Sequence, residues 1–383
     1  MFSVDTVLEV LTATALYILD YSTPIMMIAR RIFQRQSRHI IRSSNFYNFS
    51  PSKSFSSSSL PKPEQEDDEK TKAKQSASIT ATNKTVIDAT TTSIGQVIFL
   101  NSSKSGTAIL ASLAIGDPTL AAYAGLGAYT ATITAHSMGL NQQSCRDGLF
   151  GYNGALIGCA TSVFGPSFLP FAVANTIVGA SATSVLCASL NKALSQPQWT
   201  WSFNIVALTS FLRMKPMEPL AETAATDLNM GVVDFVASPL VGISQIFVVN
   251  SALTGAGIIG SIGMYSPKLG VHALGGSTLG CLVGLLFGNV DDVIFGLWGY
   301  NSALASMAVG TFFVHSREAV ALSAGSAAAS AALFGALQPV FGGWGAPCLT
   351  LPFCAVTSAC YLLEGQVSGL KLAKEPHSPE KNA

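Results

Sequence analysis

Two glutamines at equivalent positions of two similar sequence stretches are candidates for binding a small polar solute. Gln96 lies in SIGQVIFLNSSKSG and Gln245 lies in GISQIFVVNSALTG, 149 residues further along the chain. Apolar residues surround both, and a primary amide among apolar residues must find a hydrogen-bonding partner or line a wet cavity. We expect both amides to face a pore from short segments that enter the membrane without crossing it. The alternative, that each glutamine only links two helices, stays open.

Two threonines are paired in the same way. Thr200 begins TWSFN and Thr350 begins TLPFC, and each precedes a short segment that contains phenylalanine. A threonine hydroxyl can cap the start of a helix or turn its oxygen into a cavity. The repetition favours a paired polar ring where the two halves of the chain meet, and both roles can coexist.

A glycine-rich block forms the third pair, GLFGYNGALIG at 148–158 and GLWGYNSALASMAVG at 296–310. Tyr152 and Leu156 are four residues apart, as are Tyr300 and Leu304, so each couple shares one helix face. Two such faces opposed would form a narrow slot with flat apolar walls. The small residues of the blocks are expected to let helices approach closely. They are Gly148, Gly151, Gly154, Gly158, Gly296, Gly299 and Ser302.

Three blocks repeated in the same order indicate that one ancestral unit was duplicated. A duplicated membrane unit is a common way to build a transport path between two halves. Each half offers five apolar segments, and an odd number turns the second copy upside down relative to the first. The expected fold is an all-α membrane protein with two inverted-topology homologous halves, each of five transmembrane helices and one re-entrant pore helix. The expected spans are 105–115, 118–136, 148–164, 168–190 and 203–212, then 254–265, 269–287, 296–314, 319–337 and 351–363.

The composition also indicates a membrane protein. Hydrophobic residues make up 49% and charged residues 11% of the chain, whereas about 25% of the residues of soluble proteins are charged. Net charge is zero and the membrane part has no basic cluster, which argues against nucleic acid as a partner. The seven cysteines contain no CxxC pair and are expected to be buried free thiols rather than a metal site. No cofactor is expected.

The expected domain organisation has five parts. The region 1–90 contains an apolar stretch followed by arginines, which fits an anchor, an interfacial helix or a targeting segment, and then a disordered Ser-rich linker. The remaining parts are a first repeat at 91–213, a linker at 214–235, a second repeat at 236–370 and a disordered tail at 371–383.

The blocks GQVxF, GLxGYN and TxPF, each present twice in full or near-full form, closely resemble the urea transporter family over about residues 91–365. The resemblance implies ten membrane helices, two re-entrant pore helices, a homotrimer with one pore in each protomer, and passive selective flow of urea. By motif position it assigns the pore to Gln96, Phe99, Tyr152, Leu156, Thr200, Gln245, Val248, Tyr300, Leu304 and Thr350.

The chemistry of urea suits that assignment. Urea is flat, neutral and rich in N–H donors, so a slot with apolar walls and an edge of oxygen acceptors can replace its water. The sequence departs from the family blocks at three positions. Ser202 stands where the block has proline, Ser244 replaces a glycine, and Val248 makes the wall opposite Phe99 aliphatic.

Three other functions are alternatives to a urea channel. A channel for ammonia or another small neutral solute could use the same inverted architecture, but histidines are expected in a pore for ammonium, and His136, His272 and His315 are neither related by the repeat nor inside the blocks. A proton-coupled urea transporter would need a mid-membrane carboxylate, and the nearest acidic residues are expected to be helix-start or loop charges. They are Asp147, Asp291 and Asp292. An enzyme is not expected, because no nucleophile, metal cluster or phosphate loop stands out. The bilayer is the expected environment, in the plasma membrane or else an organelle membrane.

Overall fold

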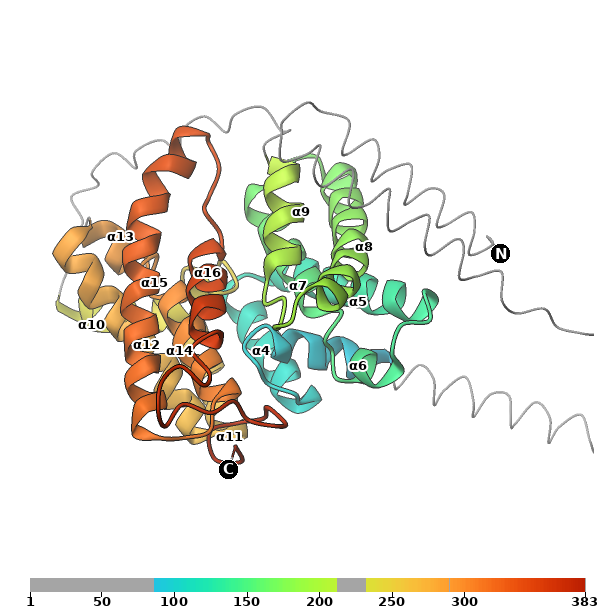
Figure 1. Ribbon diagram of the computed structural model, residues 1–383. Coiled ribbons are helices and arrows are strands. Elements are labelled where there is room, and N and C mark those ends of the chain that lie inside the picture. Colours follow the sequence, from blue (N-terminus) through green and yellow to red (C-terminus); the bar gives the residue numbers. More distant parts are fainter. Residues whose placement is uncertain (1–85, 212–231, 289, 383) are drawn as a thin grey trace, which may run out of the picture. The chain divides into compact units, whose positions relative to one another are not determined.

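The computed structural model describes residues 86–211, 232–288 and 290–382, which form helices joined by short connections (Figure 1). The first helix covers residues 86–96. The others are α4 (Ser103–Gly116), α5 (Pro118–Ser137), α6 (Gln142–Arg146), α7 (Tyr152–Phe164), α8 (Leu169–Ala193), α9 (Trp201–Phe211), α10 (Val232–Gln245), α11 (Ala252–Tyr265), α12 (Pro267–Phe287), α13 (Val290–Ile294), α14 (Tyr300–Phe312), α15 (Arg317–Gly343) and α16 (Leu351–Tyr361). Predictions for residues 1–85 and for most of the linker 214–235 lie outside the described residues, and α10 begins at Val232 within that linker.

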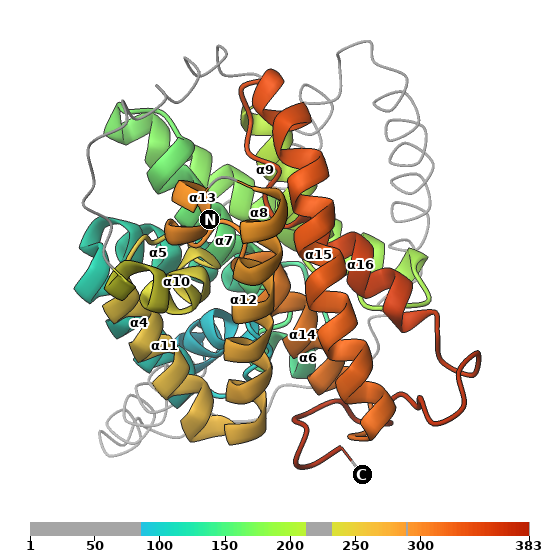
Figure 2. The ribbon, with the colours of Figure 1, turned by 90° about the vertical axis from the view of Figure 1, so that its left-hand side faces the viewer.

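The two halves contain the same elements in the same order. Helices α4 and α11 each have 14 residues, α6 and α13 each have five, and α7 and α14 each have 13. Packing partners repeat as well, since α5 contacts α7 and α8 just as α12 contacts α14 and α15. Figure 2 shows α12, α14 and α15 as neighbours. The sequence repeat is therefore also a repeat of tertiary contacts.

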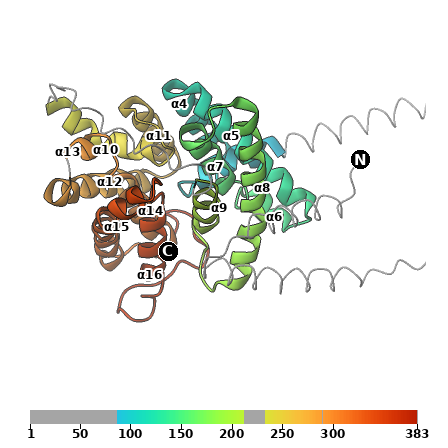
Figure 3. The same cartoon turned by 90° about the horizontal axis from the view of Figure 1, so that it is seen from above.

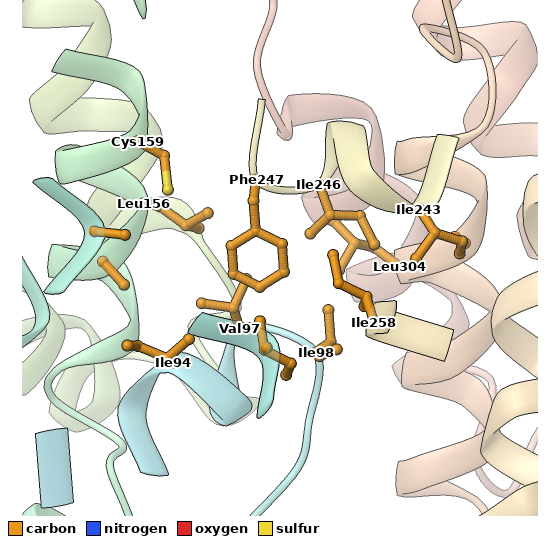
Figure 4. Packing of buried hydrophobic residues seen from close by; sticks show 14 of the residues in the cluster. Ile94, Val97, Ile98, Leu156, Cys159, Ile243, Ile246, Phe247, Ile258 and Leu304 are labelled. Carbon is orange, nitrogen blue, oxygen red and sulfur yellow. The ribbon is translucent and has the colours of Figure 1, made fainter. Parts of the chain in front are cut away.

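The halves lie side by side and meet through equivalent helices (Figures 1 and 3). Helix α4 contacts α11, and α9 contacts α16, so each of these helices packs on its own repeat counterpart. A two-fold relation brings equivalent surfaces together in this way. Apolar side chains of both halves form one buried cluster at this boundary. Figure 4 shows Phe247 within it, between Leu156 and Cys159 on one side and Ile243 and Ile246 on the other.

Helix lengths bear on the predicted spans. Among the described residues, α8, α12 and α15 are long and apolar enough to cross a membrane. Helix α16 is apolar but has only 11 residues, about 16 Å of helix against a hydrocarbon core of about 30 Å. The all-helical architecture and the apolar helices agree with the sequence analysis. The count of ten spanning and two re-entrant helices stays a prediction.

Glycines bring the backbones of α5 and α7 into contact, as predicted for the glycine-rich blocks. A Cβ atom on Gly127 would lie 2.0 Å from the carbonyl oxygen of Gly154, and one on Gly158 would lie 1.9 Å from that of Tyr123. Small residues permit this close approach between membrane helices. Gly148 has a further reason to be glycine, because its φ of +71° is left-handed.

The C-terminal segment, residues 371–382, lies within the predicted disordered tail at 371–383 and makes hydrogen bonds to the end of α14. The backbone N–H of Ala373 donates to the carbonyl of Phe312 at 2.8 Å, and Asn382 Nδ2 donates to the carbonyl of Thr311 at 2.5 Å. The end of α14 leaves carbonyl groups without helical partners, and these donors satisfy them. A polar segment without a core of its own is thus ordered by the ends of helices.

Two ionisable groups hold the same segment to the junction of α11 and α12. Glu380 accepts the backbone N–H of Lys268 at 2.7 Å and also the hydroxyl of Ser266. Burial raises the pKa of the Glu380 carboxyl, but these hydrogen bonds outweigh burial and hold the pKa below its ordinary value. The His377 ring stacks on Tyr265 with centroids 5.2 Å apart, and burial together with the Lys381 charge lowers the pKa of His377.

Candidate functional site

Two broken helices form the first part of the candidate site. After residues 86–96 the chain turns at Phe99, whose φ is +65°, and after α10 it turns at Val248, whose φ is +61°. A left-handed conformation is rare for bulky residues and is a genuine outlier for a β-branched one. Strain of this kind persists only where the surrounding structure enforces it, and it gathers at functional sites. The strained turn recurs at matched positions, so it is a shared feature of both halves.

Side-chain exposure follows one pattern in both turns. In residues 92–100 only Gln96 and Phe99 are half-buried, and in residues 241–249 only Gln245 and Val248 are. All other residues of these stretches are buried. The residues predicted from the sequence are therefore the ones whose side chains keep access to a space inside the protein or to its surroundings.

The nitrogen and the oxygen of each glutamine amide differ in their hydrogen bonding. Gln96 Nε2 donates to the carbonyl of Asp147 at 2.8 Å, and Gln245 Nε2 donates to the carbonyl of Phe295 at 2.9 Å. This is the linking role left open by the sequence. Among the described residues, no donor reaches Oε1 of either glutamine. The link fixes the amide, and its oxygen stays available as an acceptor.

Backbone carbonyls add further acceptors at the same turns. The hydrogen bonds recorded within the described residues leave the carbonyl oxygens of residues 97–99 and 246–248 without a donor. The last carbonyls of a helix have no partner inside that helix. Each broken helix therefore presents a short row of acceptors beside its glutamine.

A second pair of left-handed residues precedes α9 and α16. Trp199 has a φ of +48° and Leu349 a φ of +51°. The Tyr152 hydroxyl donates to the carbonyl of Trp199, and the Tyr300 hydroxyl donates to that of Leu349 at 2.7 Å. Asn301 Nδ2 also donates to the Leu349 carbonyl, at 3.1 Å. The predicted tyrosines thus tie the glycine-rich helices to the second pair of turns, a role that the sequence did not indicate.

The replacement of proline by Ser202 is compensated locally. A serine keeps the backbone N–H that a proline lacks, and this group needs an acceptor. Gln198 Oε1 accepts the Ser202 N–H at 3.1 Å and its hydroxyl at 2.7 Å, while Gln198 Nε2 donates to the Tyr152 hydroxyl. The second half has Cys348 and Pro352 at the corresponding positions.

The two predicted threonines meet at the boundary of the halves. Thr200 Oγ1 and Thr350 Oγ1 are 2.7 Å apart, and both residues are only 3% exposed. Thr350 occupies the N-cap position of α16, but its hydroxyl makes no capping bond. The Thr350 hydroxyl therefore contacts the other half and does not cap α16.

Two residues missed by the sequence analysis complete this polar cluster. Asn204 Nδ2 donates to Thr350 Oγ1 at 2.9 Å, and Asn204 Oδ1 accepts the Thr350 N–H at 3.1 Å. The Cys354 sulfur lies 3.1 Å from Thr200 Oγ1. Both residues follow their threonine by four positions, the spacing of neighbours on one helix face. That spacing was the signal available in TWSFN and TLPFC.

The remaining predicted wall residues lie among apolar side chains. Tyr152 and Tyr300 are half-buried, whereas Leu156 is 2% and Leu304 1% exposed. Both leucines belong to the apolar cluster between the halves. The acidic residues weighed for proton coupling take other roles. The Asp147 carboxylate accepts from Gln143 Nε2 at 3.0 Å just after α6, and the Asp292 carboxylate in α13 accepts from Gln338 Nε2 at 3.2 Å.

Comparison of the sequence with known proteins identifies the family. A sequence model of the family described as Urea transporter matches residues 87–365. The chain is 30% identical to Urea transporter 1 of Rattus norvegicus over 314 residues, which cover 75% of this chain and 80% of that protein. It is also 30% identical to Urea transporter 1 of Ovis aries over 295 residues, 70% of this chain and 75% of that protein. The chain therefore belongs to the urea transporter family of membrane proteins.

Proposed function

We propose that the protein is a passive, selective urea channel, in which urea moves down its own gradient through a narrow slot between the two halves. The proposal rests on family membership and on the paired acceptors of the candidate site. The walls would come from Phe99, Tyr152 and Leu156 in the first half, and from Val248, Tyr300 and Leu304 in the second. The oxygen-bearing edge would come from Gln96, Thr200, Gln245, Thr350 and the nearby backbone carbonyls.

The observation that supports this proposal most strongly is the fixed orientation of the two glutamine amides. Each amide N–H2 group is bound to a backbone carbonyl, at 2.8 Å for Gln96 and 2.9 Å for Gln245, so each Oε1 is held as an acceptor. Urea offers N–H donors along its edge and flat faces to apolar walls. A row of acceptors can replace the water that urea loses, whereas the proposed wall residues carry no charge to compensate an ion for its hydration. The slot would therefore favour a neutral, flat donor.

The proposed topology is an inverted repeat of ten spanning helices and two re-entrant ones. The packing of α4 on α11 and of α9 on α16 supports a two-fold relation between the halves, which an inverted repeat requires. We propose a homotrimer in the plasma membrane, with one slot in each protomer. These two features rest on the resemblance to the family.

The test is urea efflux from proteoliposomes that contain the purified full-length protein, followed by light scattering with and without a proton gradient. Fast, saturable efflux that ignores the gradient is expected. Efflux that appears only with the gradient would contradict a passive channel and favour a coupled transporter.

A double change, Gln245→Leu with Thr350→Val, should abolish urea efflux while the protein still folds and inserts. The matched control is Thr357→Val, because Thr357 lies on α16 but its buried hydroxyl has no partner among the described residues. Unaltered efflux in the double variant would remove both residues from the pathway.

A further inference from the structure

The strained turns of the two halves carry different side chains. The four non-glycine residues with left-handed φ in the described chain form two repeat-related couples, Phe99 with Val248 and Trp199 with Leu349. The first-half member of each couple is aromatic and the second-half member is aliphatic. The same strained backbone therefore carries rings in the first half and aliphatic groups in the second.

Trp199 is the centre of an aromatic cluster. Its ring meets Phe312 at 5.0 Å with an angle of 81° and Phe353 at 6.1 Å with an angle of 71°. Its indole N–H donates to Ser358 Oγ at 3.0 Å. Trp199 is 3% exposed, so its own ring does not line a pathway. With a third edge-to-face contact, to Tyr361 at 5.9 Å and 72°, three ring contacts and a hydrogen bond fix the position of the indole.

The half-buried Phe99 packs on the same two rings. Its centroid lies 6.0 Å from Phe312 at 87° and 6.2 Å from Phe353 at 60°. Trp199 and Phe99 are thus coupled through shared neighbours. An edge-to-face neighbour restrains a ring in both position and tilt, and the angles of Phe312 and Phe353 toward Trp199 set the surface that Phe99 meets.

Among the described residues, these aromatic contacts are not repeated around Val248, the repeat counterpart of Phe99. The repeat counterpart of Phe312 is Phe164, which packs on Phe211 at 5.6 Å. Leu349 is the repeat counterpart of Trp199, and Val248 is the repeat counterpart of Phe99, so both positions carry aliphatic side chains. An aliphatic side chain has no edge-to-face geometry to fix a neighbouring ring.

We infer that Trp199 is a positioning residue for selectivity, which holds Phe312 and Phe353 so that Phe99 forms a rigid flat wall at one end of the slot only. This inference rests on the proposed function. The Phe99 end discriminates solutes by thickness and width, whereas the Val248 end, with a smaller side chain, does not. Loss of the indole loosens the Phe99 wall and admits a bulkier analogue without removing any acceptor for urea.

The experiment compares permeabilities of urea and N-methylurea in proteoliposomes for wild type, Trp199→Leu and Trp199→Phe. Trp199→Leu should raise the N-methylurea to urea ratio by about threefold to tenfold, the factor that corresponds to loss of one or two ring contacts. Trp199→Phe should keep most of the wild-type ratio, because a ring remains. Leucine is accommodated at this left-handed position in the other half, at Leu349.

Trp344→Leu is the matched control. Trp344 meets Phe341 at 5.2 Å and 62°, and among the described residues Phe341 makes no ring contact with a proposed wall residue. This variant should leave the ratio unchanged even if stability falls. Ser358→Ala, which only releases the indole N–H, should move the ratio in the same direction as Trp199→Leu and serves if that variant fails to fold.

A readout independent of transport separates this inference from the proposed function. A fluorinated phenylalanine at position 99, observed by ¹⁹F NMR, should change its resonance in Trp199→Leu and in Ser358→Ala but not in Trp344→Leu. Equal changes in urea and N-methylurea flux, or an unmoved resonance, would overturn the positioning role. If wild type carries no urea, the proposed function fails, and the resonance alone decides whether Trp199 positions Phe99.

Discussion

Thr350→Val tests the polar contact between the halves, because it replaces one hydroxyl group by a methyl group of similar size. Thr350 Oγ1 lies 2.7 Å from Thr200 Oγ1 and accepts from Asn204 Nδ2 at 2.9 Å. Valine keeps the shape of the side chain and removes both contacts. It therefore removes the oxygen that a passing solute would use.

The stability cost follows from the bonds that remain. Asn204 Nδ2 still donates to the Thr200 carbonyl at 2.9 Å, and Thr200 Oγ1 still has the Cys354 sulfur at 3.1 Å. No group is left fully unpaired, so we expect a loss of about 1–2 kcal/mol in the free energy of unfolding. A solute that loses one hydrogen bond of about 1–1.5 kcal/mol should cross about tenfold more slowly.

The assay is stopped-flow light scattering on proteoliposomes of equal protein content, with unfolding followed in detergent. Thr357→Val makes the same change on the same helix, at a buried hydroxyl with no partner among the described residues. The control should keep urea efflux and should be neutral or slightly stabilising. Efflux that is unchanged in Thr350→Val, or that falls equally in both variants, would refute the role given to the threonine pair.

Three further predictions concern the fold around the site. Gly127→Ala should lower the free energy of unfolding by about 2–3 kcal/mol, because a Cβ would lie 2.0 Å from a backbone oxygen of α7. Gly125→Ala, on the same helix with nothing within 4 Å, should be neutral or stabilising in the same unfolding measurement, and equal effects would contradict the packing. Gln198→Leu should cost about 1–3 kcal/mol, since it leaves the N–H at the start of α9 unpaired, and an unchanged unfolding midpoint would exclude that bond. Acidification should release the C-terminal segment, because both shifted groups have a pKa that is lower in the folded state. The stability from His377 is full above its ordinary pKa of 6.5 and declines below it, and that from Glu380 declines below 4.5. Hydrogen exchange of the segment should speed up as pH falls, and exchange protection that does not change with pH would contradict this sign.

The paired residues of the candidate site could be selected from the sequence alone. Gln96 and Gln245, and Thr200 and Thr350, stood out because each recurs in a matched block. The spacing of a repeat and the polarity of its residues can both be read from a sequence. Which of two polar roles each residue takes is not visible, because that depends on a partner contributed by another segment, such as the carbonyl of Asp147 for Gln96.

The strained turns could not be predicted from residue types. Phe99, Trp199, Val248 and Leu349 all have left-handed φ, although nothing in bulky or β-branched residues favours that conformation. Tertiary contacts impose it, and the hydroxyl bonds from the tyrosines to the carbonyls of Trp199 and Leu349 are among them.

The contacts of the C-terminal segment could not be predicted from the sequence for a related reason. Residues 371–382 have no apolar periodicity, which is typical of a disordered tail. Their order comes from partners at the ends of α12 and α14, including Lys268 and Phe312. Hydrogen bonds to distant helix ends leave no local pattern in the sequence.

The central claim, that urea moves passively, is tested most directly by accumulation at equilibrium. Radiolabelled urea is added outside proteoliposomes that hold an imposed proton gradient, and the internal concentration is followed to its plateau. A channel predicts that the internal concentration reaches the external one and stops there, with a plateau that is the same without the gradient. A plateau above the external concentration that collapses when the gradient is dissipated would contradict passive flow.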